Sequence, residues 1–214
     1  MKTTNHGRRE GWRLGQSIAV LGLLVLAGCN VLPEAQTDPT RFYVLSSPMG
    51  TLGEPATKAP IVHLRPVELA SYIKAKPIIV RRGDNEVEFR EYARWGEPLE
   101  LGIARVLREE LLAHGAARAV LASGLRAVSV EYDYELTVRV LACEGLADGG
   151  VRFRAEWELT TAGETPHAAA HGDFNAEGLK WDGKSDSALA GQLSKAVGEL
   201  SGEIVAGLAK AGGK

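Results

Sequence analysis

Two consecutive stretches in which apolar and polar residues alternate restrict this chain to folds that contain a long, half-buried β-hairpin. Six apolar residues alternate with five polar or charged ones from residue 130 to 140, and residues 151–159 repeat the pattern. A period of two is typical of a strand with one buried and one solvated face. Asp148-Gly149-Gly150 provides a turn between the stretches, and residues 168–174 weakly continue the alternation as a third strand.

Two segments have the period of an amphipathic helix. In residues 97–114 the apolar side chains fall on one face, Pro98 suits the first helical position, and Gly115 provides a stop. In residues 186–209 apolar side chains recur every three or four positions and form one stripe. We therefore predict an α+β fold with an antiparallel or mixed β-sheet, two main amphipathic helices packed on one face and a charged opposite face.

Shorter strands are predicted earlier in the chain. Residues 41–46 have the β-branched and aromatic content of a first strand. Residues 61–64 and 77–81 are predicted as further strands, and the turn Arg82-Gly83-Asp84-Asn85 joins the second of these to Val87-Glu88-Phe89 as a hairpin.

The first 28 residues have the composition of a secretory signal peptide. An apolar run from residue 18 to 27, about half the length that a transmembrane helix needs, follows four basic residues, Lys2, Arg8, Arg9 and Arg13. Leu26-Ala27-Gly28-Cys29 matches the lipobox of bacterial lipoprotein precursors, in which the cysteine thiol accepts a diacylglyceryl group. The alternatives are an ordinary signal peptide with a coincidental cysteine, or a buried structural cysteine.

From this N-terminus we expect a signal peptide over residues 1–28, a lipidated tether over residues 29–40 and a single α+β domain over residues 41–214. Residues 30–40 are polar, contain two prolines and lack a hydrophobic period, which is typical of a linker. Three acyl chains on Cys29, palmitate among them, would give stable membrane attachment, whereas one chain binds only marginally.

Charge and cysteine content exclude several functions. Removal of residues 1–28 takes away four of the 25 basic and one of the 27 acidic residues and leaves a net charge near −5, so we expect no nucleic-acid partner. Once Cys29 is acylated, only Cys143 remains. The domain can then form no intramolecular disulfide and no cysteine-rich metal site.

Four segments follow the lipobox and extend over most of the remaining chain. They are Arg41-Phe42-Tyr43-Val44-Leu45, Arg65-Pro66-Val67-Glu68-Leu69 with Tyr72, Pro77-Ile78-Ile79-Val80-Arg81, and Glu91-Tyr92-Ala93-Arg94-Trp95-Gly96-Glu97-Pro98-Leu99 with Val106, Leu107 and Leu111. In their order and spacing these segments resemble the PqiC-type ABC transport auxiliary lipoproteins.

The resemblance implies a lipoprotein that serves in lipid traffic across the envelope and in outer-membrane integrity. Its implied partners are an MCE-domain protein and integral-membrane or ABC transporter subunits. Asn30 departs from the aspartate that retains many lipoproteins at the inner membrane. We therefore expect attachment to the outer membrane, on its periplasmic face.

Arg94 and Trp95 are the candidate partner-binding residues, because tryptophan and arginine are favoured at protein interfaces. The alternative, which we favour, is that Trp95 packs in the core across the entrance of the helix that follows.

Histidines and carboxylates offer no convincing site for chemistry. His167 and His171 would lie about 13 Å apart on a strand, too far to share a metal, so we expect solvated or edge-strand histidines and no metal site. Four carboxylates lie on the exposed phase of the alternating strands, interleaved with arginines, and we expect cross-strand ion pairs rather than acid/base catalysis; they are Asp133, Glu135, Glu156 and Glu158.

The last helix contains four glycines, each of which costs about 1 kcal/mol relative to alanine in a helix interior; they are Gly191, Gly198, Gly202 and Gly207. A close helix contact in a homo-oligomer and fraying of an exposed helix both explain them, and the choice stays open.

No nucleophile elbow, phosphate-binding glycine loop, zinc signature or dinucleotide fingerprint occurs in the sequence. We therefore expect a docking module that is not an enzyme, with no catalytic residues and no cofactor. A lipid-anchored periplasmic enzyme and a scaffold for outer-membrane assembly are the alternatives.

Overall fold

The computed structural model describes residues 37–48, 57–122 and 131–213. The predicted signal peptide, Cys29, Asn30 and Val130 lie outside the described residues. The chain divides into two units, Met1–Pro39 and Thr40–Lys214, and the helices and strands below belong to the second unit.

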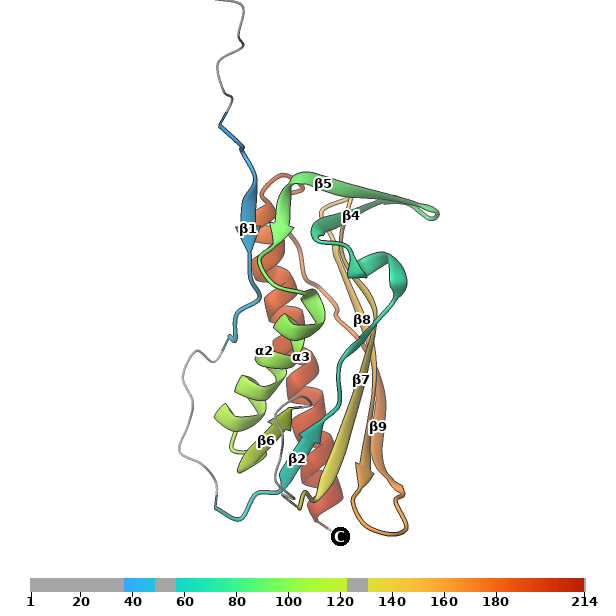
Figure 1. Ribbon diagram of the computed structural model, residues 1–214. Coiled ribbons are helices and arrows are strands. Elements are labelled where there is room, and N and C mark those ends of the chain that lie inside the picture. Colours follow the sequence, from blue (N-terminus) through green and yellow to red (C-terminus); the bar gives the residue numbers. More distant parts are fainter. Residues whose placement is uncertain (1–36, 49–56, 123–130, 214) are drawn as a thin grey trace, which may run out of the picture. The chain divides into compact units, whose positions relative to one another are not determined.

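The second unit is built from a mixed nine-stranded sheet and two long helices (Figure 1). In chain order the described elements are β1 (Arg41–Tyr43), β2 (Ile61–Leu64), β3 (Glu68–Leu69), the 3₁₀ helix η2 (Ser71–Lys74), β4 (Pro77–Gly83), β5 (Glu86–Trp95), α2 (Leu99–Ala113), β6 (Ala119–Ala122), β7 (Tyr134–Leu146), β8 (Val151–Thr161), β9 (Ala168–Asn175) and α3 (Asp186–Gly212). This arrangement confirms the predicted α+β class.

Strand β7 organises the sheet because it has partners along both edges. On one edge β8 runs antiparallel to it, and β9 pairs antiparallel with β8. On the other edge β2, β3 and β4 pair with β7 one after another, all parallel to it. The segment from residue 61 to 83 therefore follows β7 along most of its length.

The remaining strands extend the sheet beyond these partners. Strand β5 forms an antiparallel hairpin with β4, as predicted, and β1 pairs in parallel with β5. Strand β6 pairs in parallel with β2. Among the described strands β1, β3, β6 and β9 each have a neighbour on one side only.

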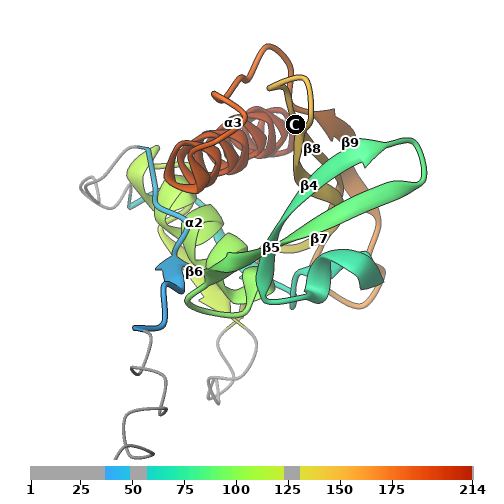
Figure 2. The same ribbon diagram turned by 90° about the horizontal axis from the view of Figure 1, so that it is seen from above.

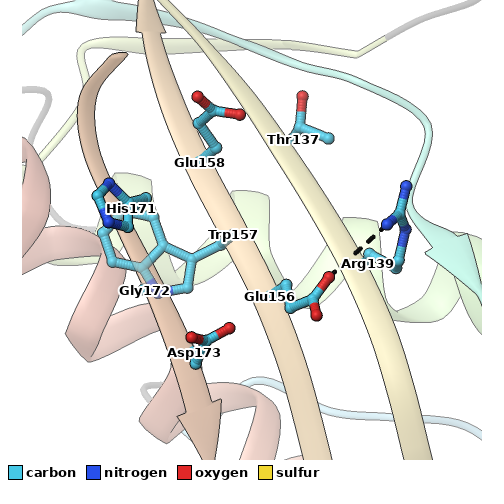
Figure 3. Close-up of a pocket in the computed structure, with 8 residues that line it drawn as sticks. All are labelled: Thr137, Arg139, Glu156, Trp157, Glu158, His171, Gly172 and Asp173. Carbon is cyan, nitrogen blue, oxygen red and sulfur yellow. Dashed lines mark ion pairs between the residues drawn. The ribbon is translucent and has the colours of Figure 1, made fainter.

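Both helices cover the same side of the β7–β8–β9 strands, as Figure 2 shows from above. Helix α3 packs against α2 and against β7, β8 and β9, and α2 also contacts β6. The opposite side of these strands is polar and charged and includes Arg139, Glu156 and Glu158 (Figure 3). The predicted division into one covered and one charged face is confirmed.

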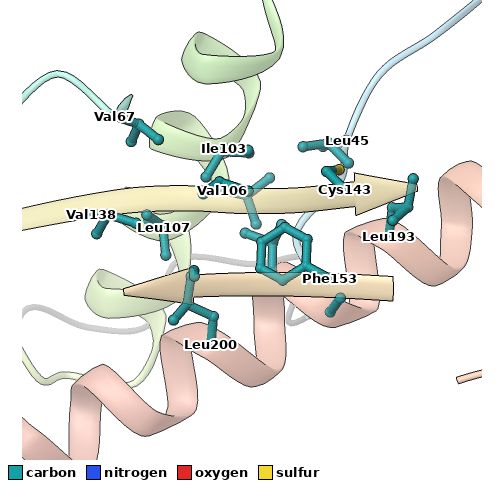
Figure 4. Packing of buried hydrophobic residues seen from close by; sticks show 14 of the residues in the cluster. Leu45, Val67, Ile103, Val106, Leu107, Val138, Cys143, Phe153, Leu193 and Leu200 are labelled. Carbon is teal, nitrogen blue, oxygen red and sulfur yellow. The ribbon is translucent and has the colours of Figure 1, made fainter. Parts of the chain in front are cut away.

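The core lies between the helices and the sheet (Figure 4). Helix α2 contributes Ile103, Val106 and Leu107, whose solvent exposure is 0%. Leu193 and Leu200 of α3 are equally inaccessible. From the sheet, core side chains include Val138 and Phe153, both on the apolar phase of the alternation. Each such side chain contributes about 1.5–3 kcal/mol of burial free energy, so this layer dominates the stability of the domain.

Helix α2 starts at Leu99, two residues inside the predicted segment 97–114, and ends with a recognised motif. Pro98 is the N-cap, with an extended ψ of 129°, and not the first helical residue; its carbonyl accepts hydrogen bonds from the N–H groups of Leu101 and Gly102. At the other end Gly115 has a φ of 63°, and the N–H groups of Gly115 and Ala116 donate to carbonyls of the last turn. This Schellman arrangement confirms the predicted glycine stop.

Strand β7 lies four residues downstream of the predicted start and extends six residues past the predicted end. Upstream of Tyr134 the β7–β8 ladder ends at Thr161, and Asp133 is held by backbone hydrogen bonds with Ile61 and Ala162 without belonging to the strand. A bulge between Val140 and Ala142 then shifts the register, and residues 142–145 are all buried. The apolar–polar alternation therefore ends before the strand does.

Trp157 of β8 occupies space that two glycines leave open. A Cβ atom on Gly172 of β9 would lie 2.6 Å from the indole Nε1, and one on Gly207 of α3 would lie 2.5 Å from Cη2. The indole N–H donates a hydrogen bond to Glu203 of α3 at 2.8 Å. Trp157 thus joins β8 and β9 to the last helix.

The other glycines of α3 divide into two kinds. A Cβ on Gly198 would lie 2.7 Å from Cγ of Pro48, whereas a Cβ on Gly191 or Gly202 would meet no described atom within 4 Å. Packing within the chain, which the sequence analysis did not consider, therefore explains Gly198 and Gly207. The oligomer contact stays a hypothesis for Gly191 and Gly202.

We predict opposite effects for alanine at these two kinds of position. Gly191→Ala and Gly202→Ala should each raise the free energy of unfolding by roughly 0.5–1 kcal/mol, because they remove only backbone freedom. Gly207→Ala should lower it by about 1–3 kcal/mol, because the new methyl group overlaps the Trp157 ring. Urea titration followed by circular dichroism measures both. If Gly191→Ala instead destabilises the protein and lowers the molecular mass of the assembly in solution, the oligomer contact is supported.

Candidate functional site

The two candidate partner-binding residues lie at the end of β5 and point to opposite faces. Trp95 is 6% exposed and belongs to the core, and its backbone N–H donates to the carbonyl of Lys76 at 2.8 Å. Arg94 is exposed. The burial of Trp95 agrees with the packing interpretation, although Trp95 is the last residue of a strand and lies three positions before the N-cap of α2. The two residues do not form a joint patch.

Arg94 instead shares its face with apolar side chains of the neighbouring strand. In the parallel pair of β1 and β5, Phe42 lies opposite Arg94 and Tyr43 lies opposite Trp95. Phe42 and Val44 are 67% and 57% exposed, and Tyr92, two residues before Arg94, is 49% exposed. We call these four residues, Phe42, Val44, Tyr92 and Arg94, the outer face of the β1–β5 pair.

An open groove of about 660 Å³ adjoins this outer face. It is lined by Val44, Leu45, Ser46, Ser47, Gly96, Glu97, Arg105 and Glu109. The Arg105 guanidinium donates to the carbonyl of Leu45 at 2.7 Å and to Glu97 at 2.6 Å. The hydrogen bond that Arg105 donates to Glu97 is the main cause that raises the pKa of Arg105 above its ordinary value. Arg105 therefore ties the segment after β1 to α2.

The charged sheet face forms a second candidate surface. A groove of about 370 Å³ is lined by Thr137, Arg139, Glu156, Trp157, Glu158, His171, Gly172 and Asp173 (Figure 3). A neighbouring groove of about 650 Å³ shares Thr137 and Glu158 and adds side chains such as Arg65, Lys74 and Glu100. Carboxylates outnumber bases in both grooves. This surface can offer ion pairs and hydrogen bonds to a polar partner.

The carboxylates of this face are held in ways that only partly match the prediction. Glu156 pairs with Arg139, its direct cross-strand neighbour, at 3.7 Å. Glu135 lies opposite His63 of β2, at 3.3 Å from its Nδ1, and pairs with Arg65 at 3.6 Å. The pair of Arg139 and Glu156 was expected, whereas the prediction did not include His63 and Arg65 as partners of Glu135.

Asp133 departs from that prediction because it lies before β7 rather than in it. Its Oδ2 accepts a hydrogen bond from the backbone N–H of Ile61 at 2.7 Å. Arg152, expected to pair on the exposed face, lies 3.6 Å from the buried Glu144 instead. Glu158 is exposed and lies opposite His171 in the sheet register.

The two histidines occupy different settings. His167 precedes β9, and its Nδ1 lies 3.0 Å from Oγ1 of Thr161. His171 lies in β9, which is an edge strand. Within the described residues, no group of three or more His, Cys, Asp or Glu side chains is placed to hold a metal ion.

A buried ion pair, which the sequence analysis did not identify, joins β4 to β7. The Glu144 side chain is 0% exposed, and Arg81 Nε lies 2.6 Å from its Oε1 while Nη2 lies 3.3 Å from Oε2. The hydrogen bond to Glu144 is the main cause that raises the pKa of Arg81 above its ordinary value. The Arg81 guanidinium also lies 5.8 Å from the centre of the Tyr72 ring. The pair therefore holds η2, β4 and β7 together.

Cys143 lies next to this pair, and its thiol is unreactive at neutral pH. The thiol is fully buried, and burial, followed by the negative charge of Glu144, raises the pKa of Cys143 to about 12. The thiolate is the nucleophilic form of cysteine, and almost none is present at neutral pH.

We predict that Cys143 does not react with thiol reagents in the folded protein at pH 8. It should react only when the domain opens, so its labelling rate should rise with urea in parallel with unfolding. Mass spectrometry after brief exposure to iodoacetamide measures this. Rapid labelling at pH 8 without denaturant would show that the side chain is accessible.

The apolar outer face of the β1–β5 pair was missed for a physical reason. Residues 42–45 are apolar on both phases, a pattern that predicts a strand buried on both sides. In the structure β1 is an edge strand, so one of its sides stays open. The signal that could have revealed it is the shortness of the segment together with its position directly after a linker.

The described part of the chain contains no helix with the length and hydropathy needed to cross a bilayer. Cys29 lies outside the described residues. Its lipidation therefore stays a prediction.

Comparisons with solved structures support the fold. The chain resembles protein XCC0632 from Xanthomonas campestris, described under the family model DUF330, with 17% identity, a TM-score of 0.63 and coverage of 78% of this chain and 93% of that one. A second crystal structure, of an uncharacterised protein, gives 16% identity, a TM-score of 0.55 and coverage of 78% and 97%. No curated protein sequence matches the chain.

The family comparison is more specific than these likenesses of fold. The model for the ABC-type transport auxiliary lipoprotein component matches residues 43–205, which is about three quarters of the chain. The match includes α2, all strands from β2 to β9, and α3 up to residue 205. The chain therefore belongs to the family of ABC-type transport auxiliary lipoprotein components.

Proposed function

We propose that this protein is a PqiC-type lipoprotein that acts as a docking component of an MCE/ABC-type lipid-transport system. In this proposal Cys29 carries the acyl chains, and the domain lies at the periplasmic face of the outer membrane. Its partners are an MCE-domain protein and the integral-membrane or ABC subunits of the same system. Its role is to support the integrity of the outer membrane rather than to catalyse a reaction.

One observation carries the proposal. The sequence places a lipobox cysteine at residue 29, and the family match begins at residue 43, so a short linker separates the anchor from a transport-associated domain. Asn30 in place of aspartate supports sorting to the outer membrane.

The chemistry of the domain supports docking over catalysis. The buried thiol of Cys143 is held protonated, which makes it a poor nucleophile. Glu135 and Glu156 are engaged by neighbouring basic side chains. The open grooves and exposed side chains are better suited to a partner surface than to an enclosed reaction site.

Co-purification from membranes tests the proposal. The intact lipoprotein with a C-terminal tag is extracted in mild detergent and isolated, and the bound proteins are identified by mass spectrometry. We expect enrichment of an MCE-domain protein and of permease or ATPase subunits relative to an unrelated tagged lipoprotein. Recovery of outer-membrane assembly proteins without any MCE protein would favour the scaffold alternative and overturn this proposal.

A further inference from the structure

We infer that the outer face of the β1–β5 pair, formed by Phe42, Val44, Tyr92 and Arg94, rests in the headgroup region of the membrane to which the chain is anchored. This inference rests on the proposed lipidation of Cys29. It adds that the folded domain has a defined membrane-facing side.

The exposed side chains of this face are placed together by the strand register. Phe42 lies opposite Arg94, and side chains two residues apart on a strand share a face, which adds Tyr92 and Val44. Gly96 follows on the same face, where a Cβ would lie 3.3 Å from Val44 Cγ1 and 3.8 Å from Phe42 Cβ. Because glycine has no side chain, it leaves the two apolar groups uncovered.

Large exposed apolar side chains are concentrated here. The described residues include five of them, Phe42, Val44, Phe89, Tyr92 and Leu101, and three of the five belong to this face. Leu101 lies one helical turn before Arg105, which contacts the carbonyl of Leu45. Single exposed apolar residues are ordinary, but a cluster of this kind marks a binding surface.

The short sequence separation between the face and the anchor indicates what covers it. Phe42 follows Cys29 by 13 residues, which even fully extended reach no more than about 45 Å. The face is thus the first part of the domain after the lipid anchor. A tether this short keeps the local concentration of membrane surface high, so even weak contacts are populated.

The chemistry of the face fits lipid headgroups. Aromatic side chains with a polar tip, such as tyrosine, favour the membrane interface, and phenylalanine inserts below it. Arginine binds phosphate through two parallel hydrogen bonds. Arg94 makes no ion pair with the described carboxylates. After cleavage the chain carries a net charge near −5, so anionic lipids would repel most of its surface but attract this cation.

A fluorescent label tests the inference in the full lipidated protein. Val44→Cys is labelled with an environment-sensitive dye, and Glu164→Cys, in the turn between β8 and β9, is the matched control. Acylation blocks Cys29, and burial protects Cys143, so the label is specific. The proteins are reconstituted into vesicles of phosphatidylethanolamine and phosphatidylglycerol that contain lipids with a quencher near the headgroup.

We expect at least about twofold quenching at residue 44, because a group on this face inserts about 5–10 Å into the headgroup boundary. At residue 164 we expect almost no quenching. Arg94→Glu in the labelled protein should remove at least about half of the quenching when phosphatidylglycerol is present. An unchanged melting temperature shows that this variant is folded.

Three other results would overturn the inference, and they are distinguishable. If the native lipoprotein does not float with vesicles, the anchor fails and the inference fails with it. If it floats but residue 44 is quenched no more than residue 164, the inference alone is wrong and the proposed function stands. If residue 44 is shielded in native membranes but not in protein-free vesicles, the face binds a protein instead.

Discussion

Arg81→Met should lower the free energy of unfolding by about 3 kcal/mol or more, because it leaves the fully buried carboxylate of Glu144 without its main partner. The cost arises mainly from the unpaired charge, since methionine fills much of the space of the arginine stem. Arg152 lies 3.6 Å from the same carboxylate and is 40% exposed, so it compensates only in part. Urea or thermal unfolding, followed by circular dichroism, measures the change.

Two control variants separate the charge from the packing. Glu144→Gln in the Arg81→Met background should recover part of the lost stability, because an amide needs no counter-ion. Arg152→Met alone should cost about 1 kcal/mol or less, as is usual for a partly exposed pair. Equal losses for Arg81→Met and Arg152→Met would contradict the geometric argument, as would a double variant less stable than Arg81→Met alone.

Cys29→Ser should abolish stable membrane attachment without changing the stability of the domain. Serine cannot accept the diacylglyceryl group through a thioether, and Cys29 lies outside the unit Thr40–Lys214 that holds the core. The variant should be lost from the membrane fraction and should fail to complement deletion of the gene in a test of outer-membrane integrity, such as detergent sensitivity.

The matched control for this variant is Asn30→Asp, which keeps the thiol but restores the residue associated with inner-membrane retention. We expect it to remain membrane-bound, to shift between membrane fractions on a density gradient and to complement poorly. Full complementation by Cys29→Ser at native expression levels would show that the anchor is dispensable, and the proposed function would then need another basis.

Sequence periodicity was sufficient to predict the layers of this fold but not to predict which strands pair. The α3 stripe and the apolar phase of β8 predicted the core because both follow directly from one buried face. The parallel pairing of β2, β3 and β4 with β7 has no local signal, because it depends on where distant segments dock. The short strands β3 and β6 were not predicted for the same reason.

The sequence placed Arg94 and Trp95 before the helix entrance but did not indicate the exposed side chains that surround Arg94. Which of the two residues is buried depends on where β5 ends, because side chains alternate between the faces of a strand. The Arg81–Glu144 pair could not be predicted from the sequence, because Glu144 lies beyond the bulge, where the alternation no longer indicates which residues are buried. Long-range contacts of this kind require the assembled sheet.

The dependence of β7 on distant partners also sets an order of events during biogenesis. Its ladder needs residues from 61 onward on one side and β8 on the other, and the resulting core is closed only by α3, which ends at Gly212. Sheets with many non-local pairings fold slowly, typically in milliseconds to seconds. If the chain is exported from its N-terminus and lipidated at Cys29, as we propose, residue 29 reaches the modifying enzymes before the helix that completes the fold has crossed, and lipid attachment precedes folding.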